Sequence, residues 1–274
     1  MTTGIEWADE TWNPIRGCQI VSEGCANCYA MRQAGHPRLG GPGKAYEGLT
    51  RKNADGKSVW TGEVRFAETQ IDAPLKWKSP KRIFVCSMSD LFYEGVDDGW
   101  RHRIFDVMAQ RPDHRFLLLT KRPDIARKYF RRIAGVSSSS FSSLFGHVWL
   151  GVSVENQDQA RARIPILLDT PVGGGRFISA EPLLDELNLQ RWLNKLDWVI
   201  AGGESGPDAR RTSGLWIMHL NNQCEDHDVP FFFKQWGEWH PTKGRVGRRR
   251  AGHLLYGETF QAIPAQLDLS GGAA

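Results

Sequence analysis

The chain has 274 residues, of which 41% are hydrophobic and 24% charged, with a formal net charge of +4 at pH 7. This composition is normal for a globular protein that buries a large core, and the small positive charge permits an anionic partner without requiring one. No apolar stretch approaches the roughly 20 residues of a membrane helix, and the first residues do not read as a signal sequence, so we expect a cytoplasmic protein with no membrane partner.

The first motif along the chain is a group of three cysteines, Cys18, Cys25 and Cys28, with the spacing C-x6-C-x2-C; we call residues 18–28 the cysteine loop. Three thiolates can hold three irons of a four-iron cluster and leave the fourth open to a small molecule. Iron–sulfur clusters and S-adenosylmethionine are the usual equipment for radical chemistry in proteins. The motif therefore favours an enzyme with an open [4Fe-4S] cluster.

Zinc is the alternative that the spacing leaves open. Cys-x2-Cys is half of a zinc knuckle, and His36, eight residues after Cys28, would complete a Cys3His site. Disulfides are not expected, because the chain has five cysteines, an odd number, and is too large to need them. Cys86 and Cys224 are expected to be ordinary residues of a strand and a helix.

Further along, a helix is expected to begin at Cys28, and the glycine-rich, polar segment 35–62 is predicted to be an irregular surface excursion. From residue 82 onward, short apolar runs alternate with segments of helical spacing. The runs are 82–88, 116–120, 148–153, 176–179, 198–201 and 230–234, and the helices are expected near 100–110, 123–133, 156–168, 187–196 and 213–226. The serine tract 137–140 is predicted to be a flexible loop.

This alternation of apolar runs and helical segments predicts an α/β fold. Short strands separated by helices indicate parallel strands with crossover helices, and continuous apolar runs indicate strands buried on both faces. We expect a parallel (β/α) barrel, complete or partial, over residues 1–241, with the cysteine loop after the first strand. Residues 242–274 are predicted to form a basic, partly irregular tail.

Polar residues follow the predicted strands, and in a parallel barrel all these ends converge on the face where active sites are built. Carboxylates there could accept hydrogen bonds from a ribose or an ammonium group, Lys121 or Arg122 could pair with a carboxylate, and paired glycines allow close approach of a ligand. The candidate cofactor-binding residues are Ser87, Ser89, Asp90, Lys121, Ser153, Glu155, Glu181, Gly202, Gly203 and Glu204.

Together these motifs resemble the phage-associated three-Cys-motif proteins, a family related to the radical S-adenosylmethionine enzymes. The resemblance covers roughly residues 4–240 and rests on the cysteine loop with its flanks and on the segments 90–92, 119–123, 151–155, 179–184, 201–206 and 233–237. It implies a radical-SAM-like barrel in which Cys18, Cys25 and Cys28 ligate a [4Fe-4S] cluster, and in which residues 87–90 lie where such enzymes bind the methionyl amino group. The first cysteine gap is six residues rather than the superfamily's usual three, and Gly-Gly-Glu occurs late, at residues 202–204.

The resemblance also implies a reaction. The cluster would reduce S-adenosylmethionine to a 5′-deoxyadenosyl radical that takes a hydrogen atom from the substrate, with an electron donor such as flavodoxin or ferredoxin as partner. We expect a nucleic acid as the substrate, for repair or modification. The basic stretches 121–122, 127–132 and 245–250, with Trp236 and Trp239 as stacking candidates, would suit such a substrate.

Two other functions remain open at this point. One is a magnesium-dependent nuclease or hydrolase with a structural zinc site, in which Asp90, Glu155, Glu181 and Glu204 hold the metal. The other is a non-catalytic, zinc-containing nucleic-acid-binding module, which would explain the cysteines but not the polar strand ends.

Overall fold

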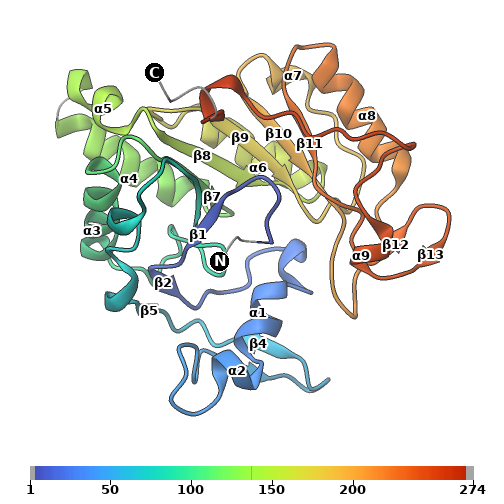
Figure 1. The fold of residues 1–274 in the computed structure, drawn as a ribbon, viewed down its shortest axis with the longest axis horizontal. Helices are drawn as coiled ribbons and strands as arrows, with labels where there is room; N and C mark the ends of the chain where they lie inside the picture. Colours follow the sequence, from blue (N-terminus) through green and yellow to red (C-terminus); the bar gives the residue numbers. More distant parts are fainter. Residues whose placement is uncertain (1–3, 137, 270–274) are drawn as a thin grey trace.

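The protein is built on seven parallel strands that curl into a half-barrel (Figure 1). The computed structural model describes residues 4–136 and 138–269. The strands are β1 (Glu10–Trp12), β6 (Arg82–Val85), β7 (Arg115–Thr120), β8 (Val148–Ser153), β9 (Arg176–Ala180), β10 (Trp198–Ala201) and β11 (Phe231–Phe233), and they lie in this order across the sheet. The predicted parallel barrel is therefore confirmed in its partial form.

Helices connect successive strands. They are α1 (Tyr29–Ala34), α3 (Asp98–Ala109), α4 (Pro123–Val136), α5 (Ser138–Phe145), α6 (Gln157–Leu168), α7 (Gln190–Leu193) and α8 (Gly214–Glu225). Three of them begin at side-chain caps, because the side chains of Asp97, Asn156 and Ser213 accept hydrogen bonds from backbone N–H groups of the first turns of α3, α6 and α8. The prediction of a flexible loop at 137–140 is wrong for residues 138–140, which begin α5. Ser137 lies outside the described residues.

The two faces of the sheet carry separate hydrophobic cores. Alternate strand residues such as Val85, Leu118 and Ile178 pack with the helices in an outer core. The residues between them, large and mostly aromatic, form an inner core on the concave side. The inner core includes Trp7, Phe84, Leu117, Trp149, Phe177, Trp198, Ile200, Phe232 and Leu267.

The excursion predicted at 35–62 contains regular elements. These are α2 (Pro37–Gly40) and an antiparallel hairpin of β3 (Thr50–Lys52) and β4 (Ser58–Trp60), followed by β5 (Arg65–Phe66), which pairs with β2 (Ile15–Arg16). A third hydrophobic cluster, which includes Met31 and Trp60, packs the excursion against α1. The excursion thus supports the helix that begins directly after Cys28.

The segment predicted as a basic tail covers an edge of the sheet. The chain first forms a hairpin of β12 (Trp239–His240) and β13 (Gly244–Arg245) and the short α9 (Arg248–Ala251), and the last two of these elements lie within the predicted tail. The N–H of Phe233 then donates to the carbonyl of Phe260 (2.6 Å), and the N–H of Ala262 donates to that of Phe231 (3.0 Å). These bonds satisfy the edge of β11, which would otherwise be open for pairing. Short 3₁₀ turns lie at Glu23–Cys25, Glu68–Gln70, Pro74–Lys76 and Ala265–Leu267.

No helix among the described residues is long and apolar enough to cross a membrane.

Candidate active site

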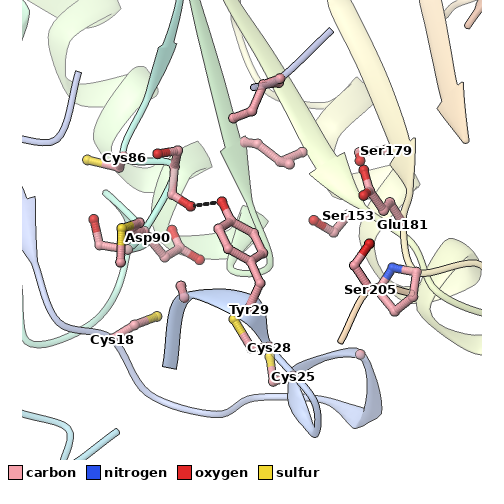
Figure 2. Close-up of a pocket in the computed structure, with 18 of the residues that line it drawn as sticks. Cys18, Cys25, Cys28, Tyr29, Cys86, Asp90, Ser153, Ser179, Glu181 and Ser205 are labelled. Atoms are coloured by element: carbon pink, nitrogen blue, oxygen red, sulfur yellow. Dashed lines mark hydrogen bonds between the residues drawn. The ribbon is translucent and has the colours of Figure 1, made fainter. Parts of the chain in front are cut away.

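The carboxyl ends of the strands surround a cavity of about 710 Å³, which we call the main cavity (Figure 2). All three cysteines of the cysteine loop line it, together with residues that follow β6, β7, β9, β10 and β11 and the last residue of β8. Figure 2 shows Tyr29 pointing from the start of α1 into the cavity. Cys25 and Cys28 lie close to the backbone of Tyr29, and Cys18 lies farther away, at the start of the cysteine loop. The convergence of strand ends that the sequence predicted is therefore present in the fold.

The wall of the main cavity changes from apolar to polar toward the carboxyl ends of the strands. On β9 the concave side carries Phe177 in the inner core and then Ser179 and Glu181 in the cavity wall. On β8 it carries Trp149, Gly151 and then Ser153. A side chain at Gly151 would lie 2.5 Å from the ring of Phe177, so close packing of that ring requires glycine. The cavity therefore has a hydrophobic base and a polar rim.

The three thiols are chemically suited to a metal cluster. Burial, with smaller contributions from Asp90 and Cys28, raises the pKa of Cys18 to about 12, and burial also raises the pKa of Cys28. Buried thiols of this kind keep their protons unless a bound cation replaces them. No three His, Cys, Asp or Glu side chains in the described residues are close enough together to hold a single metal ion. A mononuclear zinc site needs its sulfurs at about 2.3 Å from one ion, whereas in an iron–sulfur cluster the thiolates bind different irons.

Glu155 holds the cysteine loop rather than lining the main cavity. Its carboxylate is fully buried and accepts hydrogen bonds from Arg163 (2.8 Å), from the N–H of Gly24 (3.2 Å) and from the Ser22 hydroxyl. The ammonium group of Lys121 lies 3.5 Å away. Burial alone would raise the pKa of Glu155, but the two cations hold it below its usual value, so the carboxylate stays ionised.

Glu204 and Arg210 form a second attachment of the cysteine loop. The guanidinium of Arg210 donates to both carboxylate oxygens of Glu204 (2.9 and 2.6 Å) and reaches Glu23 of the loop at its carboxylate (3.1 Å) and carbonyl (3.2 Å). The side-chain amide of Asn27 donates to Glu204 (3.1 Å). Burial would raise the pKa of Glu204, but the hydrogen bonds from Arg210 lower it. The late Gly-Gly-Glu motif thus reaches the cysteine loop through its glutamate.

Asp90 belongs to a third attachment. Its oxygens accept from the hydroxyl of Thr120 (2.8 Å), the N–H of Lys121 (3.1 Å) and the guanidinium of Arg122 (3.1 Å), and Arg122 also donates to the carbonyl of Gln19 (3.1 Å) in the cysteine loop. With these partners in place, Asp90 has little remaining capacity to bind a ligand.

The other candidate residues occupy different positions in the wall. Ser87 and Ser89 line the main cavity but donate their hydroxyls to Asn13 (3.2 Å) and to the carbonyl of Ile15 (2.9 Å). Lys121 and Ser153 also line it. Glu181 lines it as an ion pair with Lys234 (2.7 Å).

Of the two glycines, only Gly203 lines the main cavity. A Cβ at Gly203 would lie 2.0 Å from the carbonyl oxygen of Trp236, so the backbone of a neighbouring loop requires the glycine there. The sequence does not distinguish this packing requirement from close approach of a ligand.

Sequence reasoning missed several residues of the site. Tyr29 lines the main cavity and donates its hydroxyl to the carbonyl of Ser87; its place directly after Cys28 was the available signal. Lys234 ends a predicted strand but is not among the predicted cofactor-binding residues. Arg210 lies in an irregular loop, and nothing in its neighbourhood of the sequence singles it out. Cys86, predicted to be an ordinary strand residue, lines the cavity and has a positive φ of 58°.

The features proposed for nucleic-acid contact are divided between the two sides of the protein. Trp236 is 1% exposed, so the prediction that it is available for stacking is wrong. The basic residues of α4 pair with acids of the outer layer, Arg127 and Arg131 with Asp169 (2.8 Å each). Trp239 is half-buried, with the guanidinium of Arg211 4.2 Å from its ring centroid.

A smaller cavity of about 340 Å³ adjoins the main one, between the start of α1, the β3–β4 hairpin and residues 205–208. Arg32 lines both cavities, and Arg248 lines the main one. Within the part of the chain that the structure describes, neither side chain forms a hydrogen bond or an ion pair. His36 lines the smaller cavity as an exposed residue whose Nδ1 accepts from the N–H of Arg38 (3.2 Å) and caps α2.

Residues 2–264 match the family described as "Protein of unknown function (DUF5131)". No curated protein and no solved structure matches the chain. Because the match spans nearly all of the sequence, including the cysteine loop and every strand of the half-barrel, the chain belongs to the DUF5131 family.

Proposed function

We propose that this protein is a radical S-adenosylmethionine-type enzyme and that Cys18, Cys25 and Cys28 hold a [4Fe-4S] cluster at the rim of the main cavity. One observation carries the proposal: three thiols from one loop line the same cavity as the ends of the parallel strands. Thiols beside a polar cavity are suited to chemistry on a bound small molecule, whereas a structural metal staple has no need of such a cavity.

The residues present fit the cluster in their chemistry. Three thiols are available, and the loop that carries them is fixed at Gln19, Ser22, Glu23 and Asn27 by side chains from other parts of the chain. When bound, such a cluster supplies the electron that cleaves S-adenosylmethionine to a 5′-deoxyadenosyl radical.

The remaining residues of the site serve binding and exclusion of water. The inner core, in which Trp7 and Leu267 meet the strands, closes the base of the main cavity. Lys121 and the Glu181–Lys234 pair present charges of both signs in the wall, as a zwitterionic ligand requires. A cavity whose base is closed in this way holds reactants in line and limits the access of solvent to reactive species. Arg32 and Arg248 line the main cavity without a hydrogen bond or ion pair from their side chains to any described residue. They support a nucleic acid as the substrate, since each can meet a phosphate.

The arrangement of charges argues against a magnesium-dependent hydrolase. Each strand-end carboxylate is already paired with a cation, which a metal ion would have to displace. The pairs are Asp90–Arg122, Glu155–Arg163, Glu181–Lys234 and Glu204–Arg210. The use of His36 as a helix cap similarly argues against a Cys3His zinc module.

The test is anaerobic purification followed by iron and sulfide analysis, absorption spectroscopy and electron paramagnetic resonance of the dithionite-reduced protein, with and without S-adenosylmethionine. We expect about four irons per chain and a reduced spectrum that changes when S-adenosylmethionine is added. Cys18→Ala, Cys25→Ala and Cys28→Ala should each lose the signal, whereas Cys224→Ala, in α8 and outside the main cavity, should keep it. A colourless, zinc-loaded protein from iron-replete cells would refute the proposal.

A further inference from the structure

Two serines that line the main cavity have hydroxyls with no partner among the residues that the structure describes. Ser153 ends β8 and Ser179 lies in β9, and the two face each other in the register of the sheet. They are 6% and 3% exposed, and both line the main cavity. Neither side-chain oxygen forms a hydrogen bond with any residue that the structure describes. Figure 2 shows the two hydroxyls on the same wall as Glu181.

This pair differs from three other buried polar residues of the main cavity. Asp90, Thr120 and Glu204 all have protein partners. Because both side chains line the main cavity, water or a ligand supplies the hydrogen bonds of their hydroxyls. The position of two such hydroxyls side by side, facing open space, points to hydrogen bonds with a ligand.

The surroundings of the serines define the chemistry of that ligand. Below them the main cavity is lined by the apolar side chains of Trp7, Phe84 and Leu119. Glu181 and Lys234 neutralise each other at 2.7 Å, and the ammonium group of Lys121, which follows β7, lies 3.5 Å from the carboxylate of Glu155. A phosphate or carboxylate would therefore find both of these cations already beside carboxylates. A flat, uncharged ring would find an apolar surface and two hydroxyls, each able to donate and to accept.

We propose that Ser153 and Ser179 recognise the polar edge of a nucleobase of the substrate, held over the apolar base of the main cavity. The inference rests on the proposed function, because the base is that of the substrate in the same cavity as the cluster. A base can reach this depth only from a single strand or after extrusion from a duplex. The substrate class is therefore a nucleic acid that presents one unstacked nucleotide.

The experiment compares two fluorescently labelled, single-stranded DNA trinucleotides, one with a central base and one abasic at that position, on cluster-loaded protein. Wild-type protein should bind the intact trinucleotide about tenfold more tightly than the abasic one, as expected for two hydrogen bonds and a buried ring. Ser153→Ala/Ser179→Ala should abolish this preference without lowering stability, since it removes two unpartnered hydroxyls. Ser143→Ala, at an exposed position of α5, is the matched control and should keep the preference.

The affinity for S-adenosylmethionine, measured on the same preparations, shows whether the serines bind the nucleobase of the substrate or the adenine of the cofactor. If the double variant loses affinity for S-adenosylmethionine and keeps the base preference, the serines bind the adenine of the cofactor and the inference is wrong. An unchanged preference with unchanged cofactor affinity also overturns it. Iron content and the paramagnetic signal of these preparations report on the proposed function separately, so the failure of one can be told from the failure of the other.

Discussion

The ion pairs that hold the cysteine loop and those on the surface of α4 join the same residue types in opposite surroundings. The side chains of Glu155 and Arg163 are 0% and 5% exposed, whereas those of Asp169 and Arg131 are 51% and 55% exposed. Breaking a buried pair leaves a desolvated charge, but breaking an exposed pair returns both charges to water. The buried ion pair that holds the cysteine loop therefore contributes more to stability than the exposed pair on the surface of α4.

The largest expected effect follows from Glu155→Ala, which would leave the buried guanidinium of Arg163 without its partner. We expect the free energy of unfolding to fall by about 3–5 kcal/mol and cluster content to fall with it, because Ser22 and Gly24 lose their acceptor. Urea unfolding and iron analysis measure the two effects. The matched control, Asp169→Ala on the outer surface, should cost at most about 1 kcal/mol and leave the iron content unchanged. Equal losses in the two variants would contradict the comparison.

A smaller effect on stability is expected from Arg210→Ala, because this side chain is 29% exposed. We expect a loss of roughly 1 kcal/mol, together with an altered paramagnetic signal and reduction potential of the cluster, since Arg210 positions Glu23 and Glu204. The neighbouring Arg211→Ala removes only a contact with Trp239 and is the control. Arg210→Lys should restore the stability of the protein more fully than the reduction potential of the cluster. Lysine keeps the charge but cannot donate to both carboxylate oxygens of Glu204 in the geometry of a guanidinium. A wild-type signal in Arg210→Ala would show that the attachment has no effect on the cluster.

The smallest effect is the pH dependence of stability between neutral pH and pH 5. Burial lowers the pKa values of His114 and His147, so the unfolded chain binds protons more readily, and stability is lost as pH falls below about 6.5. We expect the free energy of unfolding to fall by at most about 1.4 kcal/mol per histidine per pH unit. The pKa of Glu155 is lowered instead, so the stability from its ion pairs is fully present above about pH 4.3 and is lost only as pH falls through the folded-state pKa.

Urea unfolding from neutral pH to pH 3.5 should therefore show two separate declines. Glu155→Gln should keep the first decline and show a smaller second one, to which Glu204, Asp98 and Asp113 still contribute through their own lowered pKa values. If the variant follows the wild-type profile at every pH, Glu155 does not contribute through its charge.

Much of the fold follows from the sequence for a local reason. Continuous apolar runs such as 116–120 and 148–153 predict buried parallel strands, and the structure has β7 and β8 there. The serine tract misled the prediction because Phe141 supplies a buried anchor, and tertiary packing outweighs the weak helix propensity of serine.

The roles of the strand-end residues were not predictable, because the contacts that decide them span the chain. Glu155 meets Gly24 across 131 positions, and Asn27 meets Glu204 across 177. No local pattern distinguishes a carboxylate that faces the main cavity from one that holds a loop. The inward alternation of Phe177, Ser179 and Glu181 was visible in the sequence, and with the half-barrel known it identifies the polar wall.

Trp7 and Leu267 both belong to the inner core, and this has a consequence for the order of folding. Bringing together residues so far apart in the chain closes a very long loop. The entropic cost of this closure makes assembly of the inner core slow. During synthesis the strands and outer helices can assemble as they emerge, but the base of the main cavity stays open until the ribosome has released residue 267. Insertion of the cluster before that moment would expose it to solvent, so we expect insertion to follow the emergence of residue 267 rather than to precede it.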